Sequence, residues 1–237
     1  MLDRIAVAAC GDHQELVIEI GPGKGALTEK LLARADRVIT IEIDSLMVGQ
    51  LRARFLSTPQ LEIVHADVLA TDLGQWGSAV VVGNLPYYIT SPIVRQVLSM
   101  SPAPRRVVLL VQKEVAKRLA APPSTRDFGL LTVETALFAS ARELFDVKPG
   151  SFRPPPEVDS SVVLLEPHAR AAELGIANVE EFVEFASRCF HQKRKTLRNN
   201  LAPHYGKVTI DAWPEASLRA EQTSIEMLAD LYRRLVH

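Results

Sequence analysis

The sequence has few cysteines and no long apolar runs, and both absences narrow the class of protein. Its 237 residues include no run of eighteen apolar residues that could span a membrane, and no charged-then-apolar leader of the secretory type. The two cysteines, Cys10 and Cys189, lie far apart, and the six histidines show no metal-ligand spacing. We therefore expect no membrane span, no disulfide, no metal site and a cytoplasmic location.

Charge of one sign is not in excess either, because 27 lysines and arginines face 28 aspartates and glutamates, for a net charge of −1. The chain as a whole is not a polycation that gathers phosphate without specificity. Any affinity for nucleic acid has to come from a local patch. One basic cluster lies late in the sequence and consists of Lys193, Arg194, Lys195 and Arg198. A charge run is often only a solvated face, so both interpretations stay open on charge alone.

Short runs rich in β-branched residues recur along the first two-thirds of the chain and predict the strands of a parallel sheet. The runs are continuously apolar, which is typical of strands covered on both faces. They span residues 16–20, 38–43, 61–64, 79–82 and 107–111, and a last run spans 161–166. Segments with helical spacing, such as 26–33 and 45–55, separate the strands and indicate a doubly wound α/β domain.

Composition changes after the last of these strands. From about Ala171 the pattern becomes helical, with Phe182, Phe185, Ala186 and Cys189 at three- and four-residue steps. We therefore expect two domains, an α/β domain over residues 1–168 and a small helical domain over residues 169–237.

The first predicted strand runs into a tight glycine loop, Gly21-Pro22-Gly23-Lys24-Gly25. Its G-x-G-x-G spacing differs from the G-x-G-x-x-G of dinucleotide sites and from the phosphate-binding loop, in which the lysine precedes serine or threonine. A tighter loop suits S-adenosylmethionine, which carries no phosphate group. The alternative is a strand-to-helix turn without a ligand.

Carboxylates at the ends of the next two strands favour the ligand. Glu42 lies about twenty residues beyond the loop, where a carboxylate can accept both ribose hydroxyls, and Asp67 is placed to accept from the adenine amine of a cofactor. Asp44 is expected to cap a helix and Glu19 to support the loop. The predicted cofactor residues at these strand ends are Gly21, Gly23, Glu42 and Asp67.

The fourth strand ends in Gly83-Asn84-Leu85-Pro86-Tyr87-Tyr88, the most specific motif in the chain. An adenine amine is a poor nucleophile because its lone pair is conjugated into the ring. The Asn84 side-chain oxygen and the Leu85 carbonyl can accept its two N–H groups, and Pro86 restricts the direction of that carbonyl. Tyr87 offers a face for stacking. The motif predicts methylation of an adenine amine; the alternative is an ordinary strand exit with a buried asparagine.

A base inside a double helix cannot present its amine, so the target has to be unpaired or flipped out. Phe152, in the proline-rich stretch 150–156, is the candidate for a second wall of the base pocket. Stacking on an aromatic side chain is worth roughly 1–3 kcal/mol per base. The alternative is that Phe152 is an apolar plug beneath its loop.

Four of these stretches together resemble the KsgA-type ribosomal RNA adenine N6-dimethyltransferases. The matching residues are 19–28 (Glu-Ile-Gly-Pro-Gly-Lys-Gly-Ala-Leu-Thr), 84–90 (Asn-Leu-Pro-Tyr-Tyr-Ile-Thr), 152–161 and 192–201, and the likeness covers nearly the whole chain. The resemblance implies a Rossmann-like class I S-adenosylmethionine-dependent methyltransferase domain followed by a small all-α domain. It assigns to the cofactor Gly21, Glu42, Asp67 and Asn84. It assigns to the target adenine Asn84, Leu85, Tyr87 and Phe152.

The resemblance also implies the substrate and the partners. The substrate is expected to be two adjacent adenines in a hairpin of small-subunit (16S) ribosomal RNA, and the partner the precursor of the small ribosomal subunit. The enzyme is expected to be a monomer and not to bind a membrane. In that setting the basic cluster at 193–198 is expected to contact phosphates. Family members begin with a segment containing Gly-Gln-Asn/His-Phe-Leu that covers the methionine end of the cofactor. This sequence starts within the following helix, so that lid is expected either to precede Met1 in a longer chain or to be missing.

Three other functions stay open on the sequence. The first is an adenine dimethyltransferase of the antibiotic-resistance type that acts on large-subunit ribosomal RNA. The second is a non-catalytic ribosome-assembly factor, which an intact base-pocket motif disfavours. The third is a small-molecule methyltransferase, which would need neither the basic helical domain nor a pair of stacking rings.

Overall fold

The computed structural model describes residues 1–85, 89–152 and 155–236 and divides the chain into two compact units. Unit 1 consists of Met1–Ala116 and Ser140–Pro167. Unit 2 consists of Lys117–Ala139 and His168–His237.

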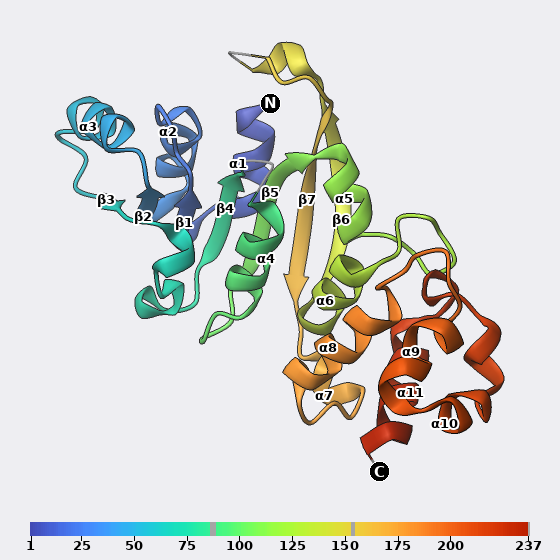
Figure 1. Cartoon of the computed structure of the whole chain (residues 1–237). Coiled ribbons are helices and arrows are strands. Elements are labelled where there is room, and N and C mark those ends of the chain that lie inside the picture. The colour runs from blue at the N-terminus through green and yellow to red at the C-terminus, as the bar shows by residue number, and fades with distance from the viewer. Residues whose placement is uncertain (86–88, 153–154, 237) are drawn as a thin grey trace. The chain divides into compact units, whose positions relative to one another are not determined.

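Unit 1 is built around a seven-stranded sheet with the order β3-β2-β1-β4-β5-β7-β6 (Figure 1). Strands β1 to β5 pair in parallel, whereas β7 runs antiparallel to β5. The predicted parallel sheet is thus confirmed for β1 to β5, and its far edge is mixed. The strands are β1 Gln14–Ile20, β2 Ala35–Glu42, β3 Leu61–His65, β4 Val80–Asn84, β5 Arg106–Gln112, β6 Ala139–Val147 and β7 Ser160–Pro167.

Both faces of the central strands of this sheet are buried. Val80 and Val82 of β4 belong to one apolar cluster with residues of the helices α1 (Leu2–Cys10) and α2 (Ala26–Leu32). Val81 points to the opposite face, because side chains alternate along a strand, and it is equally buried. This is the burial that the continuously apolar runs predict. The other helices of unit 1 are α3 Ser45–Arg54, α4 Thr90–Leu98 and most of α5 Lys113–Leu119.

The strand order places a topological switch point between β1 and β4. From β1 the chain moves outward to β2 and β3, then crosses to β4 and β5 on the other side of β1. Ile20 pairs with Ile41 and with Gly83, and Glu42 pairs with His65. These pairs bring the ends of four strands to one edge, where open α/β sheets bind ligands.

Unit 2 is helical and has its own core. Its helices are α6 Leu130–Phe138, α7 Arg170–Glu173, α8 Val179–Cys189, α9 Leu197–Tyr205, α10 Lys207–Asp211 and α11 Ile225–Val236. Phe182 and Phe185 of α8 are fully buried, and the Phe182 ring meets the Tyr232 ring of α11 edge-on at 5.5 Å between centroids. Along the described residues, no helix has the length and apolar character needed to cross a membrane.

The segment Lys117–Ala139 differs from the sequence prediction, which places it in the α/β domain over residues 1–168. The compact units assign it to the helical part of the chain. Phe128, Val133 and Leu137 explain the difference, because they are buried in the same apolar cluster as α8, α9 and α11. The helical unit is therefore assembled from two separate stretches of sequence.

Candidate functional site

The glycine loop forms a compact turn between β1 and α2. Gly21, Gly23 and Gly25 all have positive φ, at 68°, 53° and 79°. A side chain on Gly25 would be blocked as well as strained, because its Cβ would lie 2.6 Å from Cε2 of Phe55 and 2.8 Å from Cδ2 of Leu51. The loop therefore needs glycine at this position to pack against α3.

Glu42 ends β2 and is held rigidly against the loop. Its Oε2 accepts a hydrogen bond from the Gly23 N–H at 3.2 Å, and its Oε1 accepts one from the Asp44 N–H at 3.0 Å. The residue is only 8% exposed. A carboxylate has about four acceptor positions, so two bonds to the backbone fix the group and leave it able to accept from a ligand.

A cavity of about 250 Å³ lies at this edge of the sheet and gathers three of the predicted cofactor residues. Gly21, Glu42 and Asp67 line it. Asp67 is exposed and caps a short 3₁₀ turn, Val68–Ala70, by accepting from the Leu69 N–H at 2.9 Å. Gly23 does not line the cavity and acts on it through its bond to Glu42.

The apolar walls of the cavity were not predicted from sequence. They include Ile43, Leu69, Ile89 and Ile93. Ile43 follows Glu42 directly and is 65% exposed, which is unusual for an isoleucine after a buried strand. The sequence offered one signal for this wall, an isoleucine directly after the carboxylate that ends the strand. The sequence alone does not show that this isoleucine is exposed.

Asn84 lies beside the glycine loop. A Cβ on Gly21 would sit 3.6 Å from the Asn84 carbonyl oxygen, so the two backbones are in close approach. Asn84 itself is exposed and is not among the residues that line the cavity. The structure thus brings its backbone to the predicted site, and the engagement of its side-chain amide with the base stays a prediction.

Leu85 is anchored through its backbone N–H and through its side chain. Its N–H donates to the Leu110 carbonyl at 3.1 Å, and its side chain is 2% exposed. That side chain folds back over Gly83, where a Cβ would come within 2.7 Å of Leu85 Cδ2, so a larger residue there would have to displace the buried Leu85 side chain. The predicted residues Pro86 and Tyr87 lie outside the described residues.

Phe152 has a packing contact of its own in unit 1. Its half-buried side chain packs against the apolar cluster formed by α1, α2 and the sheet. This is the contact expected of an apolar plug, the alternative that the sequence left open. A stacking role for Phe152 stays a prediction.

Asp44 and Glu19 have the supporting roles that the sequence suggested. Asp44 caps α3, accepting from the Leu46 N–H at 2.8 Å and the Met47 N–H at 3.3 Å. Glu19 is fully buried in β1 and accepts from the Thr28 hydroxyl of α2 at 2.6 Å. Burial raises the pKa of Glu19 to about 7, and the negative charge of Glu42 also acts to raise it.

The Glu19 carboxyl gives a testable dependence of stability on pH. The pKa of Glu19 is 4.5 in the unfolded chain and about 7 in the folded protein. Its favourable contribution to stability is therefore complete below about pH 4.5 and is lost as the pH rises through 7. Glu19→Gln removes this loss while keeping an oxygen for the Thr28 hydroxyl. We expect the variant to be more stable than the parent by about 3 kcal/mol well above pH 7.

Urea unfolding at a series of pH values measures this difference. The stability gain should shrink toward zero at about pH 4.5, where both side chains are uncharged. A gain that does not change with pH would show that Glu19 acts through packing and not through its charge.

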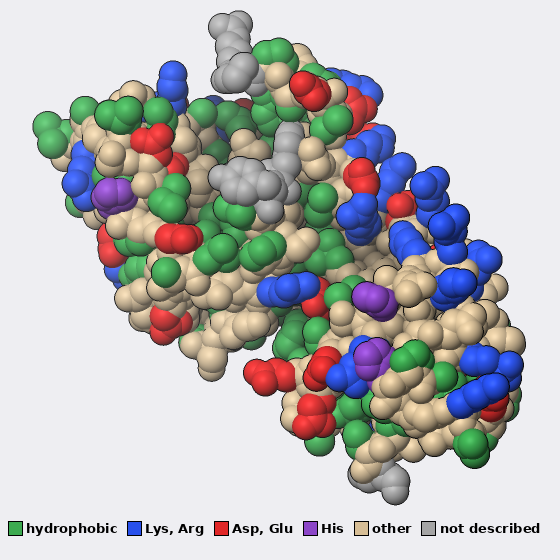
Figure 2. Space-filling view, in the orientation of Figure 1, with side chains coloured by type: hydrophobic (Ala, Val, Ile, Leu, Met, Phe, Trp, Pro, Cys, Tyr) green, Lys and Arg blue, Asp and Glu red, His purple; other side chains and the backbone are tan. Residues whose placement is uncertain are grey.

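The basic cluster lies on the segment between α8 and α9, at the surface of unit 2. Lys193, Arg194 and Lys195 are exposed, and Lys193 Nζ donates to the Arg126 carbonyl at 2.9 Å. Arg198 lies in the first turn of α9, and its Nε forms an ion pair with Oδ1 of Asp211 at 2.7 Å. Figure 2 shows lysine and arginine side chains gathered toward the right of the face in view. The Asp211 carboxylate therefore partly neutralises Arg198, and contact of the cluster with phosphate groups stays a prediction.

The comparison with known proteins points to one family. The family described as Ribosomal RNA adenine dimethylase matches residues 1–234 of the chain. The Ribosomal RNA small subunit methyltransferase A of Acidobacterium capsulatum is 45% identical over 229 residues, which cover 92% of this chain and 81% of that protein.

Two solved structures resemble the whole chain. A dimethyladenosine transferase from Plasmodium falciparum superposes with a TM-score of 0.80 at 28% identity, over 98% of this chain and 96% of the other. The 23S rRNA methyltransferase ErmE has a TM-score of 0.72 at 27% identity, over 100% of this chain and 97% of the other. The similarity therefore extends over the α/β unit and the helical unit alike.

Proposed function

This chain belongs to the ribosomal RNA adenine dimethylase family, and from that membership we infer that it is an S-adenosylmethionine-dependent enzyme that dimethylates adenine N6 in small-subunit ribosomal RNA. The identity of 45% to a small-subunit methyltransferase, against 27% to a 23S rRNA methyltransferase, favours the small-subunit substrate. The expected targets are two adjacent adenines of a 16S hairpin.

The observation that carries this function is the meeting of Gly21, Glu42 and Asp67 around one cavity, with the Asn84 backbone beside it. These residues suit the cofactor. A buried carboxylate fixed by two N–H groups is a preorganised acceptor for vicinal hydroxyls, and apolar cavity walls suit a purine ring. In this proposal Glu42 accepts the ribose hydroxyls and Asp67 the adenine amine, while Ile43 and Leu69 contact the faces of the adenine.

When bound, S-adenosylmethionine supplies the methyl group on a sulfonium and leaves as neutral S-adenosylhomocysteine. The protein's contribution lies in holding the target. Asn84 Oδ1 and the Leu85 carbonyl accept the two N–H groups of the adenine amine and favour a pyramidal nitrogen, whose lone pair can then attack. The alkylated nitrogen gives up its proton to solvent, so no general base is needed. Positioning of this kind can contribute roughly 7–11 kcal/mol.

The rigid backbone around Leu85 supports this assignment. The Leu85 N–H is committed to Leu110, and its side chain is buried over Gly83. These contacts hold Leu85 at the end of β4, and Pro86 is proposed to restrict the direction of the Leu85 carbonyl by limiting the backbone of the residue before it. Tyr87 and Phe152 are proposed to stack on the two faces of the flipped adenine.

Unit 2 is proposed to hold the RNA, and the partner is the small-subunit ribosomal RNA within its precursor particle. One chain supplies the cofactor pocket and the pair of acceptors, so a monomer suffices for the reaction. The cytoplasm, where bacterial ribosomes are assembled, is the proposed location.

Transfer of a labelled methyl group tests the function and separates it from the large-subunit alternative. The purified chain is incubated with labelled S-adenosylmethionine and either undermethylated small subunits or large subunits. We expect incorporation into small-subunit RNA. Incorporation into the large-subunit RNA alone would assign the chain to the antibiotic-resistance type, and incorporation into neither would support a non-catalytic factor.

The basic cluster gives a prediction on salt dependence. Lys193→Glu combined with Arg194→Glu should weaken binding to small-subunit RNA by at least about tenfold and flatten the plot of log K against log salt by roughly 1.5. The plot flattens because fewer counterions are released when two phosphate contacts are lost. Filter binding over a range of salt concentrations measures both effects.

Lys207→Glu is the control for this experiment, since Lys207 is an exposed lysine of the same unit on α10. It should change the salt dependence little. If the slope of log K against log salt is unchanged in the double variant, the cluster is an ordinary solvated surface and does not contact phosphates.

A further inference from the structure

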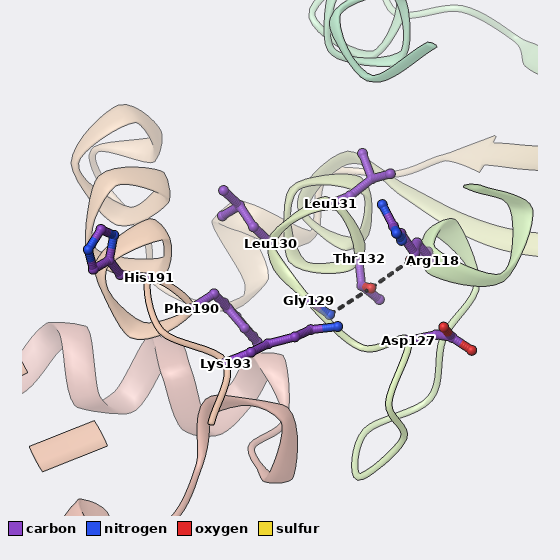
Figure 3. A pocket seen from close by; sticks show the side chains of 9 residues that line it. All are labelled: Arg118, Asp127, Gly129, Leu130, Leu131, Thr132, Phe190, His191 and Lys193. Carbon is purple, nitrogen blue, oxygen red and sulfur yellow. Dashed lines mark hydrogen bonds between the residues drawn. The ribbon is translucent and has the colours of Figure 1, made fainter. Parts of the chain in front are cut away.

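A second cavity, of about 480 Å³, is lined by residues of unit 2 alone; it shares none of them with the cavity beside Glu42 and has Lys193 in common with the basic cluster. It opens between the start of α6 and the segment that follows α8 (Figure 3). Leu130, Leu131 and Phe190 give it an apolar lining, while Arg118, His191 and Lys193 add polar and basic groups. The volume lies in the range of pockets that hold small organic groups.

One wall of this cavity is fixed by a threonine. The Thr132 hydroxyl donates to the Arg118 carbonyl at 2.6 Å and accepts from the Gly129 N–H at 3.1 Å. These two bonds join the end of α5 to the start of α6. The wall that carries Leu130 and Leu131 is therefore formed before any ligand arrives.

The opposite wall is fixed by a buried asparagine. Asn200 Nδ2 donates to the Cys189 carbonyl at 2.8 Å and to the Gln192 carbonyl at 3.3 Å, which holds the segment carrying Phe190 and Lys193. The Phe190 ring lies 6.0 Å from the ring of buried Phe128, tilted by 55°. Phe190 thus presents a supported aromatic ring to the cavity.

The charges around the cavity suit an anion. Lys193 extends across the opening toward Gly129 in Figure 3, and its Nζ donates to the Arg126 carbonyl at 2.9 Å. An ammonium has three donors, and this bond uses one of them. Asp127 also borders the cavity, but Figure 3 shows its side chain turned away from Lys193.

An aromatic ring, aliphatic side chains and two cations in one preformed pocket match the parts of a nucleotide. Proteins bind unpaired bases by stacking them on flat side chains and hold the adjoining phosphates with lysine and arginine. A site for phosphate alone would not need the apolar lining, and a site for an apolar ligand would not need Arg118 and Lys193.

We propose that this cavity binds one unstacked nucleotide of the ribosomal RNA, with its base against Phe190, Leu130 and Leu131 and its phosphate between Lys193 and Arg118. The inference rests on the proposed function, because it takes RNA to be the substrate. The pocket binds a nucleotide other than the target adenine. It would therefore give the RNA a second point of attachment, on the helical unit.

Leu131→Glu tests the pocket by placing a negative charge in it. Leu131 lines the cavity and is half-buried, outside the buried apolar core of unit 2. We expect KM for small-subunit RNA to rise about tenfold, with kcat and the affinity for S-adenosylmethionine unchanged. Val208→Glu adds the same charge at a residue that is 88% exposed on α10 and should leave KM near the parent value.

A direct measurement uses the unaltered chain and the methyl NMR signals of Leu130 and Leu131. S-adenosylhomocysteine is present in excess to fill the cofactor site, and adenosine monophosphate, ribose 5-phosphate or inorganic phosphate is added in turn. We expect the leucine signals to shift with the nucleotide and much less with the two base-free phosphates. Equal shifts with all three, or none with any, would overturn the nucleotide assignment.

The outcomes keep this inference separate from the proposed function. If the unaltered chain transfers no methyl group to ribosomal RNA, the proposed function fails. The pocket assignment alone fails under a different result. In that case the unaltered chain transfers methyl groups, Leu131→Glu has the same KM as the parent, and the nucleotide does not shift the leucine signals.

Discussion

Asn84→Ala is expected to lower kcat for methyl transfer by roughly 10²–10³-fold, the loss typical of removing one preorganised polar contact to a transition state. The side-chain oxygen of Asn84 is proposed to accept from the adenine amine as its nitrogen becomes pyramidal, and alanine offers no acceptor. The Kd for RNA should change little, because binding of the RNA draws on many phosphate contacts. Single-turnover kinetics with labelled S-adenosylmethionine, together with RNA binding, separate the two effects.

Two further variants make this result interpretable. Asn84→Asp keeps an oxygen acceptor and should retain a larger share of the activity than alanine does. Asn178→Ala removes the N-cap of α8, where the side chain accepts from the Glu181 N–H at 3.2 Å, so it should cost about 1 kcal/mol of stability without slowing the chemistry. Near-normal turnover by Asn84→Ala would exclude the proposed role of the amide.

Glu42→Ala is expected to raise the Kd for S-adenosylmethionine by roughly 10²–10⁴-fold. The side chain is proposed to accept two ribose hydroxyls, and hydrogen bonds to a charged group are worth about 1.5–3 kcal/mol each. The loss also frees the Gly23 N–H, which the carboxylate holds at 3.2 Å. Isothermal titration with S-adenosylmethionine and with S-adenosylhomocysteine measures the change, and RNA affinity should stay near the parent value.

Asp44→Ala is the matched control, since it removes a neighbouring carboxylate that caps α3 and does not line the cavity. It should lower stability by about 1 kcal/mol and leave cofactor affinity close to that of the parent. If the two variants weakened the cofactor equally, the effect of Glu42 would reflect the shape of the loop and not ribose binding.

The sequence predicts the central strands because they are buried on both faces. Val80, Val81 and Val82 are each at most 1% exposed, and this burial requires the continuously apolar run that is typical of a strand covered on both faces. Strand β6 escapes prediction for the opposite reason. It lies at the sheet edge, and its own exposed residues Ser140, Arg142 and Glu143 give it the composition of a loop.

The sequence also predicts which polar residues meet, because parallel strands end at one edge. The pairing of β1 with β2 and of β2 with β3 brings Gly21, Glu42 and Asp67, which are far apart in the sequence, to one cavity. The walls supplied by Ile89 and Ile93 were missed, since helix α4 is brought to the cavity by the fold and carries no motif. The place of Phe128 and Val133 in the helical unit was missed in the same way, because packing partners far along the chain decide it.

The product itself tests the account most directly. Small-subunit RNA that has been incubated with the chain and S-adenosylmethionine is digested to nucleosides and to short oligonucleotides, which are analysed by mass spectrometry. The account predicts N6,N6-dimethyladenosine at two neighbouring positions of one oligonucleotide, and a far smaller yield in the same incubation time when Asn84→Ala replaces the parent chain. Methyl groups found on another base, on ribose, or on nothing at all would contradict it.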